Sequence, residues 1–272
     1  MVALAAATWG TWSLFVRSTH LPSHVTSPII FAAMAIVTLP LALRERPARW
    51  DRTAIWLLLA NTACDVTNLI TFFAAMQVTT VAIAVLTHYL APILIALAAP
   101  RIEGVVTRGA RLAALVALAG LAIMLEPWRG VHDGVLVGAA LGTASAVAYA
   151  GNVFVSRRLA DRIGPARVIS YHSALAAVVT LPFAVSGLAT VSWANVGVLA
   201  AGATLPGAFA GVLFVAGLQR IGAARAGVLA FAEPVVAVCV GAFVWGEPLR
   251  PLSALGGALV LAAGIHVARQ AR

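Results

Sequence analysis

The side chains most able to do chemistry in this sequence are a few ionisable groups inside long apolar stretches. Asp65, Glu233 and His88 each lie within such a stretch. Asp65 has Asn61 four residues before it and Asn68 three residues after it, so the three share one face of a helix. If the stretch crosses lipid, such a polar face predicts a wet surface that accepts an ammonium group or a proton. The alternative is a set of interhelical hydrogen bonds that only joins helices.

Proline marks three points where a helix would break. Glu233 directly precedes Pro234, and Pro92 and Pro206 lie in other apolar stretches. Proline has no N–H group and clashes with the preceding turn, so a kink with a free carbonyl group is expected at each point. We therefore predict flexing or gating positions here, with Glu233 in contact with a ligand. The alternative is that the prolines only shape packing and that Glu233 is protonated and bonded to a neighbour.

His88 titrates near neutral pH when its environment is unperturbed, which suits it to proton coupling or to recognition of a carboxylate. A structural role is equally common for such a histidine. His172 lies nearer the end of its stretch, where a histidine is often only interfacial, so we give it less weight. The polar residues Tyr89 and Asn152 complete the predicted binding set with Asp65, Asn68, His88 and Glu233.

Aromatic residues suggest one wall of the same site. Trp9 and Trp12 lie three residues apart in the first apolar stretch, and Phe15 continues that face. Tyr149 occupies the position equivalent to Gly10 when the two halves of the sequence are aligned. Such a wall would stack against an indole or phenyl ring, or hold an organic cation over a ring face. Tryptophan also anchors helices at membrane interfaces, which is the competing interpretation.

Composition places these residues in a membrane. Of the 272 residues 62% are hydrophobic and 10% are charged, and the mean hydropathy is +0.99. The apolar runs have the length a helix needs to cross a bilayer, and their continuity excludes a transmembrane barrel. We expect an all-α integral membrane protein with ten spans, near 2–16, 26–43, 53–76, 80–99, 109–125, 134–156, 166–186, 193–218, 223–245 and 251–268. The N-terminus lacks a cleavable leader pattern, so 2–16 is expected to be a first span, and the native chain could begin earlier.

The net charge of +9 does not indicate nucleic-acid binding, because the basic residues are all arginines and nearly all of them lie in the gaps between spans. Arginine in short loops sets orientation. With a cytoplasmic N-terminus, only Arg17, Arg129 and Arg250 fall outside. We therefore expect both termini in the cytoplasm of a bacterial-type inner membrane. Cys64 and Cys239 lie inside spans, where no disulfide framework is indicated.

The two halves of the sequence are related. Residues 75–92 align with 217–234, and Thr38-Leu39-Pro40 aligns with Thr180-Leu181-Pro182 at the same spacing. Since each half holds five expected spans, an odd number, the second half must enter the membrane from the opposite side. We predict two inverted five-helix repeats, residues 1–130 and 131–272, which enclose a site near the membrane midplane.

The repeated segments resemble the EamA-type branch of the drug/metabolite transporter superfamily. The motifs that carry the resemblance are Gln219–Gly222, Phe231–Pro234, Gly246-Glu247-Pro248-Leu249, Gly256-Gly257 and Gly264 in the second half, and Trp9-Gly10, Tyr89–Pro92 and Glu103-Gly104 in the first. Ala91 stands where the second half has Glu233, and the second span lacks an arginine common in the family. The resemblance implies the ten-helix fold and outward movement of metabolites or toxic organic ions, with no prosthetic group. Residues 88–92 and the lysine-free, tryptophan-bearing first span look most like YddG-type exporters of aromatic amino acids.

The leading functional hypothesis is a secondary exporter of small amphipathic metabolites, amino acids including aromatic ones first among them, that works by alternating access. No nucleotide-binding loop is present, so an ion gradient or facilitated diffusion must drive it. The alternative is efflux of hydrophobic organic cations. A lipid-modifying enzyme is disfavoured because no nucleophile, paired acids or metal cluster is visible, and His20, His24 and His132 lack ligand-spaced partners. We expect a small-molecule substrate and the bilayer as partners; oligomeric state stays open, with a monomer as the working expectation.

Overall fold

The computed structural model describes residues 1–46, 48–104, 108–129, 134–246 and 250–270, and every regular element in them is a helix. Some sequence features lie outside the described residues: the repeat boundary at 130–131, His132 and the family-like residues Glu247, Pro248 and Leu249. The chain is an all-helical, multi-pass membrane protein. Lipid offers no partner for backbone N–H and C=O groups, and helices satisfy these groups internally.

The helices of the first half follow the expected spans closely. They are α1 (Val2–Trp9), α2 (Ser13–Val16), η1 (Arg17–Thr19), α3 (Ser23–Arg44), α4 (Arg52–Val78), α5 (Val81–His88), α6 (Ala91–Ile102) and α7 (Arg108–Leu125). Polar side chains cap two of them. The Ala54 N–H donates to Asp51 Oδ1 at the start of α4 (2.7 Å), and the Ile83 N–H donates to the Thr80 hydroxyl at the start of α5 (3.3 Å). Such caps satisfy N–H groups that have no partner within the helix.

The second half is also helical. Its helices are α8 (Val135–Ile163), α9 (Pro165–Ala184), η2 (Val185–Thr190), α10 (Trp193–Gly202), η3 (Ala203–Phe209), α11 (Ala210–Ile221), α12 (Ala223–Ala230), α13 (Ala232–Val244) and α14 (Pro251–Gln270). The segment η3 is π-helical and contains Pro206, whose missing N–H disturbs the α-helical ladder. Gly164 and Gly222 adopt positive φ angles of 91° and 80° where α9 and α12 begin.

Eight helical segments in the described part of the chain are long and apolar enough to cross a membrane. They are Ser23–Arg44, Arg52–Val78, Val81–Ile102, Val135–Ile163, Pro165–Thr190, Trp193–Ile221, Ala223–Val244 and Pro251–Arg269. A shorter apolar helix covers Gly109–Leu125. The first expected span is interrupted between α1 and α2, where Thr11 and Trp12 donate N–H bonds three residues back instead of four. That these two segments also cross the bilayer stays a prediction.

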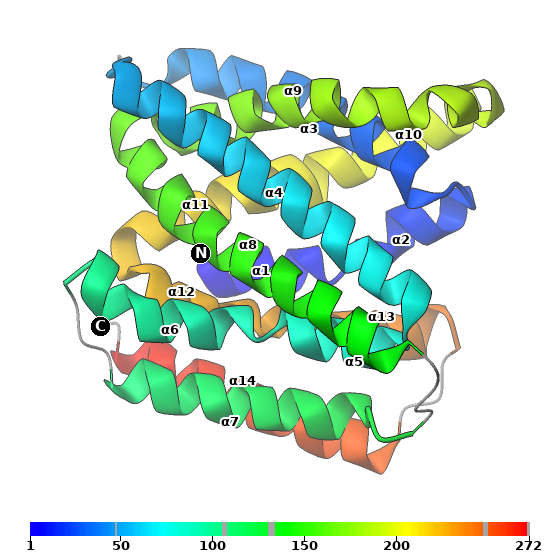
Figure 1. Ribbon diagram of the computed structural model, residues 1–272, viewed down its shortest axis with the longest axis vertical. Coiled ribbons are helices and arrows are strands. Elements are labelled where there is room, and N and C mark those ends of the chain that lie inside the picture. Colours follow the sequence, from blue (N-terminus) through cyan, green and yellow to red (C-terminus); the bar gives the residue numbers. More distant parts are fainter. Residues whose placement is uncertain (47, 105–107, 130–133, 247–249, 271–272) are drawn as a thin grey trace.

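The helices pack in paired contacts along the bundle (Figure 1). α3 packs on α9 at one end and α7 on α14 at the other. Between these pairs, α4 crosses α8, α6 contacts α12, and α1 contacts α11 and α13. Close approach depends on small residues: a Cβ on Gly256 of α14 would lie 2.3 Å from the carbonyl oxygen of Gly120 on α7.

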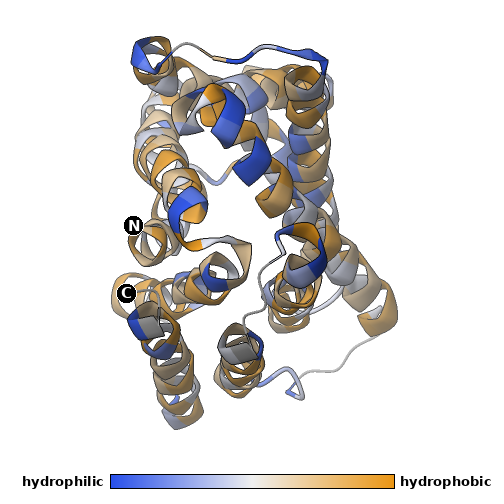
Figure 2. Cartoon of the chain, turned by 90° about the vertical axis from the view of Figure 1, so that its left-hand side faces the viewer, coloured by the Kyte–Doolittle hydropathy of each residue, from blue (hydrophilic) through white to orange (hydrophobic). Residues whose placement is uncertain are grey.

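The surface of the bundle is apolar over the helix bodies. Leu136, Trp193 and Phe243 are more than four-fifths exposed, as suits side chains that face lipid. Figure 2 looks onto the edge where the chain starts and ends, and hydrophilic helix ends gather there. The buried core is rich in alanine and surrounds larger groups such as Phe231 and Leu121, which are fully buried.

Candidate functional site

Two helix interruptions face one another at the centre of the bundle. One separates α5 from α6 at Tyr89 and Leu90, and the other separates α12 from α13 at Phe231. Tyr89 and Phe231 are counterparts in the internal repeat, and their rings lie 5.3 Å apart. Each interruption is followed by the proline of its half, Pro92 or Pro234. The carbonyl groups one turn before these prolines therefore have no α-helical N–H partner.

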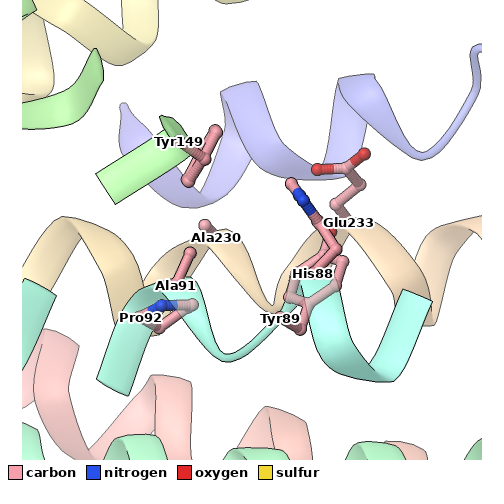
Figure 3. Close-up of a pocket in the computed structure, with 7 residues that line it drawn as sticks. All are labelled: His88, Tyr89, Ala91, Pro92, Tyr149, Ala230 and Glu233. Carbon is pink, nitrogen blue, oxygen red and sulfur yellow. The ribbon is translucent and has the colours of Figure 1, made fainter. Parts of the chain in front are cut away.

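A narrow cavity lies between the two interruptions (Figure 3). Its lining comes from α5 and α6, from α8 and from α12 and α13: His88, Tyr89, Ala91, Pro92, Tyr149, Ala230 and Glu233. The cavity is so tight that it holds roughly one water molecule. A substrate the size of an amino acid therefore requires these segments to separate.

Glu233 is the acidic residue of this cavity. It lies in the first turn of α13, where the positive end of the helix dipole favours a carboxylate. The Tyr89 hydroxyl lies within hydrogen-bonding reach of this carboxylate. Helix α1 passes so close that a Cβ on Gly10 would lie 2.5 Å from the Glu233 carbonyl oxygen. Gly10 thus lets α1 hold the start of α13 in place.

His88 has its orientation fixed by a chain of hydrogen bonds. The Ser145 hydroxyl has its acceptors on Asn68, with Oδ1 at 2.7 Å and the carbonyl oxygen at 3.2 Å. Since that hydroxyl has one proton to give, it accepts from His88 Nδ1, which is 2.8 Å away. The ring also stands edge-on to Tyr149, with centroids 5.5 Å apart. Nε2 is the ring nitrogen left for a ligand.

The polar face of α4 divides among different partners. The side chain of Asn61 accepts from the Ser156 hydroxyl at 2.6 Å, and its backbone carbonyl accepts from Asn152 Nδ2 at 3.4 Å. The side chain of Asn68 accepts from the Ser145 hydroxyl. These bonds match the interpretation of the two asparagines as links between helices. Asp65 differs, because its carboxylate faces His172 on α9, with 3.2 Å between Oδ2 and Nε2. Neither Asp65 nor Asn152 lines the central cavity.

Trp9 and Trp12, which were expected to form an aromatic wall, do not line the central cavity. Trp9 packs on Phe214 of α11, with ring centroids 4.7 Å apart. Trp12 lies against α10, where its ring would be 3.2 Å from a Cβ on Gly202. Tyr149 is the member of that set that lines the cavity, and Tyr89 supplies a second ring there. Pro206 is buried in η3 and does not line the cavity.

His172 is the residue that sequence reasoning undervalued. It is buried, 6% exposed, and faces the carboxylate of Asp65. Its partner Asp65 is far away in the sequence, so no spacing rule connects them. The sequence showed only that both are ionisable residues inside apolar helices. Such residues tend to pair with one another.

At the edge that carries both chain ends, carboxylates of the first half form hydrogen bonds and ion pairs with the second half. The Glu45 carboxylate accepts from the N–H groups of Ala166 and Arg167 (2.9 and 3.0 Å) at the start of α9. Glu103 accepts from the Ala223 N–H (3.2 Å) at the start of α12 and pairs with Arg157 (2.5 Å).

Asp51 adds a further ionic link at the same edge, because its carboxylate pairs with Arg162 of α8 (2.5 Å). The Ala54 N–H, and after it Arg162, hold the pKa of this carboxyl below its usual 3.8. Within the described residues, no group of three or more His, Cys, Asp or Glu side chains gathers closely enough to hold a metal ion.

Comparison with known proteins gives a consistent result. Residues 136–268 match the model of the EamA-like transporter family. An uncharacterized transporter of Archaeoglobus fulgidus is 30% identical over 272 residues, covering 98% of this chain and 94% of its own length. The uncharacterized transporter YcbK of Bacillus subtilis is 27% identical over 155 residues, 53% of this chain and 49% of YcbK. The fold is shared with a protein of known crystal structure that is 20% identical in sequence. The TM-score is 0.85, and the match covers 98% of this chain and 96% of that one.

Proposed function

Because the chain belongs to the EamA-like transporter family, we propose that it is a secondary transporter that exports small amphipathic metabolites by alternating access. Amino acids, aromatic ones included, are the proposed substrates. The observation that carries this proposal is the cavity between two interrupted helices, because interrupted helices at a repeat interface are the usual binding sites of secondary transporters.

The helix contacts support two inverted repeats of five helices, residues 1–130 and 131–272. Exchanging the halves maps several contacts onto others: α4 with α8 onto α11 with α1, α5 with α8 onto α12 with α1, α6 with α8 onto α13 with α1, and α4 with α9 onto η3 with α3. The pairs α3 with α9 and α7 with α14 map onto themselves. Such pseudo-symmetry allows one set of contacts to open while its counterpart closes.

The cavity chemistry fits a zwitterion. In α13 the positive helix end is already matched by Glu233, whereas Ala91 occupies the equivalent place in α6 and leaves that helix end unmatched. A substrate carboxylate is therefore favoured near the start of α6 and His88, and a substrate ammonium near Glu233. The rings of Tyr89 and Tyr149 line the same space and suit an aromatic side chain.

One observation favours the alternative, efflux of hydrophobic organic cations. Glu233 is the carboxylate of a cavity lined by aromatic rings, a combination that also binds a lipophilic cation. The cationic group would then sit between Glu233 and the ring faces. The start of α6 would have no role in binding.

Counterflow in proteoliposomes tests both functions. Vesicles loaded with unlabelled compound are mixed with labelled phenylalanine, tryptophan, alanine or tetraphenylphosphonium. We expect counterflow of the amino acids, and a loss of about tenfold or more in Glu233→Gln, the effect of losing a charged hydrogen bond of about 1.5–3 kcal/mol. Gly197→Ala, where a Cβ meets nothing within 4 Å, is the matched control. Flux of the cation alone would establish the alternative, and no flux across a broad panel would refute transport.

We also propose a bacterial-type inner membrane, both termini in the cytoplasm, and a monomer. The start of α1 lies near Arg220, and the arginine-bearing ends of α3 and α8 lie at the same edge, where the Arg49 N–H donates to the Arg162 carbonyl. Arginine in short loops favours the cytoplasmic side. A C-terminal green fluorescent protein fusion should fluoresce, and a C-terminal alkaline phosphatase fusion should be inactive; the reverse would overturn this orientation.

A further inference from the structure

The Asp65–His172 pair joins α4 to α9 away from the central cavity. Nε2 of His172 lies 3.2 Å from Asp65 Oδ2, and Nδ1 lies 2.8 Å from the carbonyl oxygen of Val168. A carbonyl oxygen can only accept, so Nδ1 carries a hydrogen. The orientation of the ring is thus fixed from within α9.

This geometry requires one further proton. With its hydrogen on Nδ1, a neutral ring would direct a bare lone pair from Nε2 at a carboxylate oxygen, and two acceptors in contact repel. The 3.2 Å contact therefore holds a proton between the groups, as an imidazolium beside a carboxylate or as a neutral ring beside a carboxylic acid. Removal of that proton turns an attractive contact between α4 and α9 into a repulsive one.

We propose that Asp65 and His172 form a proton-binding site that couples substrate export to a proton gradient, an inference that rests on the transport function proposed above. One proton binds to the pair from the outside and leaves to the cytoplasm in each cycle, in exchange for one substrate. No other bond is made or broken.

Other titratable groups lie near the pair. Cys64 on α4 and Tyr149 on α8 interact electrostatically with Asp65. Neither is a cation, so neither replaces the imidazolium when the proton leaves. Among the other titratable side chains on α4 and α9 and on the described helices packed against them, α3, α5, α8 and α11, His88 lines the cavity and Tyr171 is the neighbour of His172 in α9. The rest lie toward helix ends: His24, Arg44, Arg52, Arg157, Arg158, Asp161, Arg162, Arg167 and Arg220.

Asp65 is the more exposed member of the pair and interacts with a residue of the cavity. A quarter of the Asp65 side chain is exposed, whereas the side chain of His172 is 7% exposed, so Asp65 is the proposed entry point of the proton. Tyr149 interacts electrostatically with both Asp65 and Glu233. A change of charge at the pair is therefore felt by a residue that lines the substrate cavity.

The test is made in proteoliposomes clamped at zero membrane potential with potassium and valinomycin, with labelled phenylalanine as the probe. Counterflow at equal pH is measured first, and then accumulation driven by a gradient of one pH unit. One-for-one exchange sustains at most about a tenfold substrate gradient per pH unit. We expect accumulation of several-fold in the wild type, and none in Asp65→Asn or His172→Gln, each compared with its own counterflow.

A pH-sensitive dye inside wild-type vesicles provides a readout that needs no variant. Substrate movement should change the internal pH, and no change would overturn the inference. It would also be overturned if both variants kept the response to the pH gradient. Counterflow without gradient-driven accumulation would refute the coupling and leave the transport function standing, whereas absent counterflow would refute the transport function itself.

Discussion

Replacing Gly10 by alanine should loosen the contact that positions Glu233. Gly10 has right-handed helical angles, φ −58° and ψ −13°, so alanine is compatible with its backbone. Its Cβ, however, would lie 2.5 Å from the Glu233 carbonyl oxygen, 2.7 Å from Val236 Cβ and 2.9 Å from the Ala237 nitrogen. These are backbone and Cβ atoms of α13, and no side-chain rotation moves them away. Helix α1 must therefore shift away from α13.

Two opposing effects set the size of the change. Alanine gains up to about 1 kcal/mol over glycine in helix propensity. Forcing a methyl group into a packed contact costs about 1–3 kcal/mol. Gly197→Ala in α10 is the matched control, because its Cβ meets nothing within 4 Å and only the propensity effect remains. The difference in stability between the two variants is then the cost of the contact, about 1–3 kcal/mol.

Thermal unfolding in detergent, followed by tryptophan fluorescence at one scan rate, measures this difference. At about 2–4 °C per kcal/mol, Gly10→Ala should unfold several degrees below Gly197→Ala. Amino-acid counterflow should fall with it, because α1 no longer holds the first turn of α13. If Gly10→Ala unfolds at the same temperature as Gly197→Ala or above it, the close contact between α1 and α13 does not exist as described.

Three further variants test other contacts. Glu103→Gln removes the charge that meets the start of α12, and should lower the free energy of unfolding by about 1.5–3 kcal/mol in thermal or denaturant unfolding; an unchanged value would contradict this role. Gly142→Ala places a Cβ against the Thr87 side chain, and Thr87→Ala should partly rescue it, with a coupling of about 0.5–3 kcal/mol in a double-mutant cycle. Because the pKa of Asp51 is lowered in the fold, its stabilising effect is present above pH 3.8 and is lost as the pH falls further. The difference in unfolding temperature between wild type and Asp51→Asn should therefore shrink from pH 7 to pH 3, and a constant difference would contradict the cap.

The positions of the long helices could be predicted from the sequence, because hydrophobicity alone indicates them. Continuous apolar runs of bilayer length predicted helices that the structure places within a few residues, such as α3 at Ser23–Arg44 for the expected 26–43. The interruption between α1 and α2 was not predicted. At this interruption Gly10 meets the backbone of α13, a contact between segments far apart in the sequence. Local patterns carry no information about such an approach.

The same limit applies to the site. His88, Tyr89, Tyr149 and Glu233 were recognisable as polar groups in apolar helices, and they line one cavity. The separate partners of the polar residues on α4 were not recognisable, because Asn61, Asp65 and Asn68 share one helical face. Their respective partners on other helices are Ser156, His172 and Ser145. Partner choice follows from how α4 lies across α8 and α9, which spacing within α4 cannot reveal.

The unequal residues at equivalent positions of the two halves have physical reasons in the structure. Gly207, the counterpart of Asp65, lies against Met34, so that a Cβ would be 2.8 Å from that side chain and a larger residue would have to displace it. Ala91, the counterpart of Glu233, lines the same narrow cavity as Glu233, where a second carboxylate would repel the first and neutralise the start of α6. A single carboxylate leaves one helix end positive and makes the cavity polar along one direction. A symmetric pair of glutamates would favour a dication instead, so Ala91→Glu should weaken counterflow of amino acids more than counterflow of organic cations, and an equal effect on both would refute the polarity of the site.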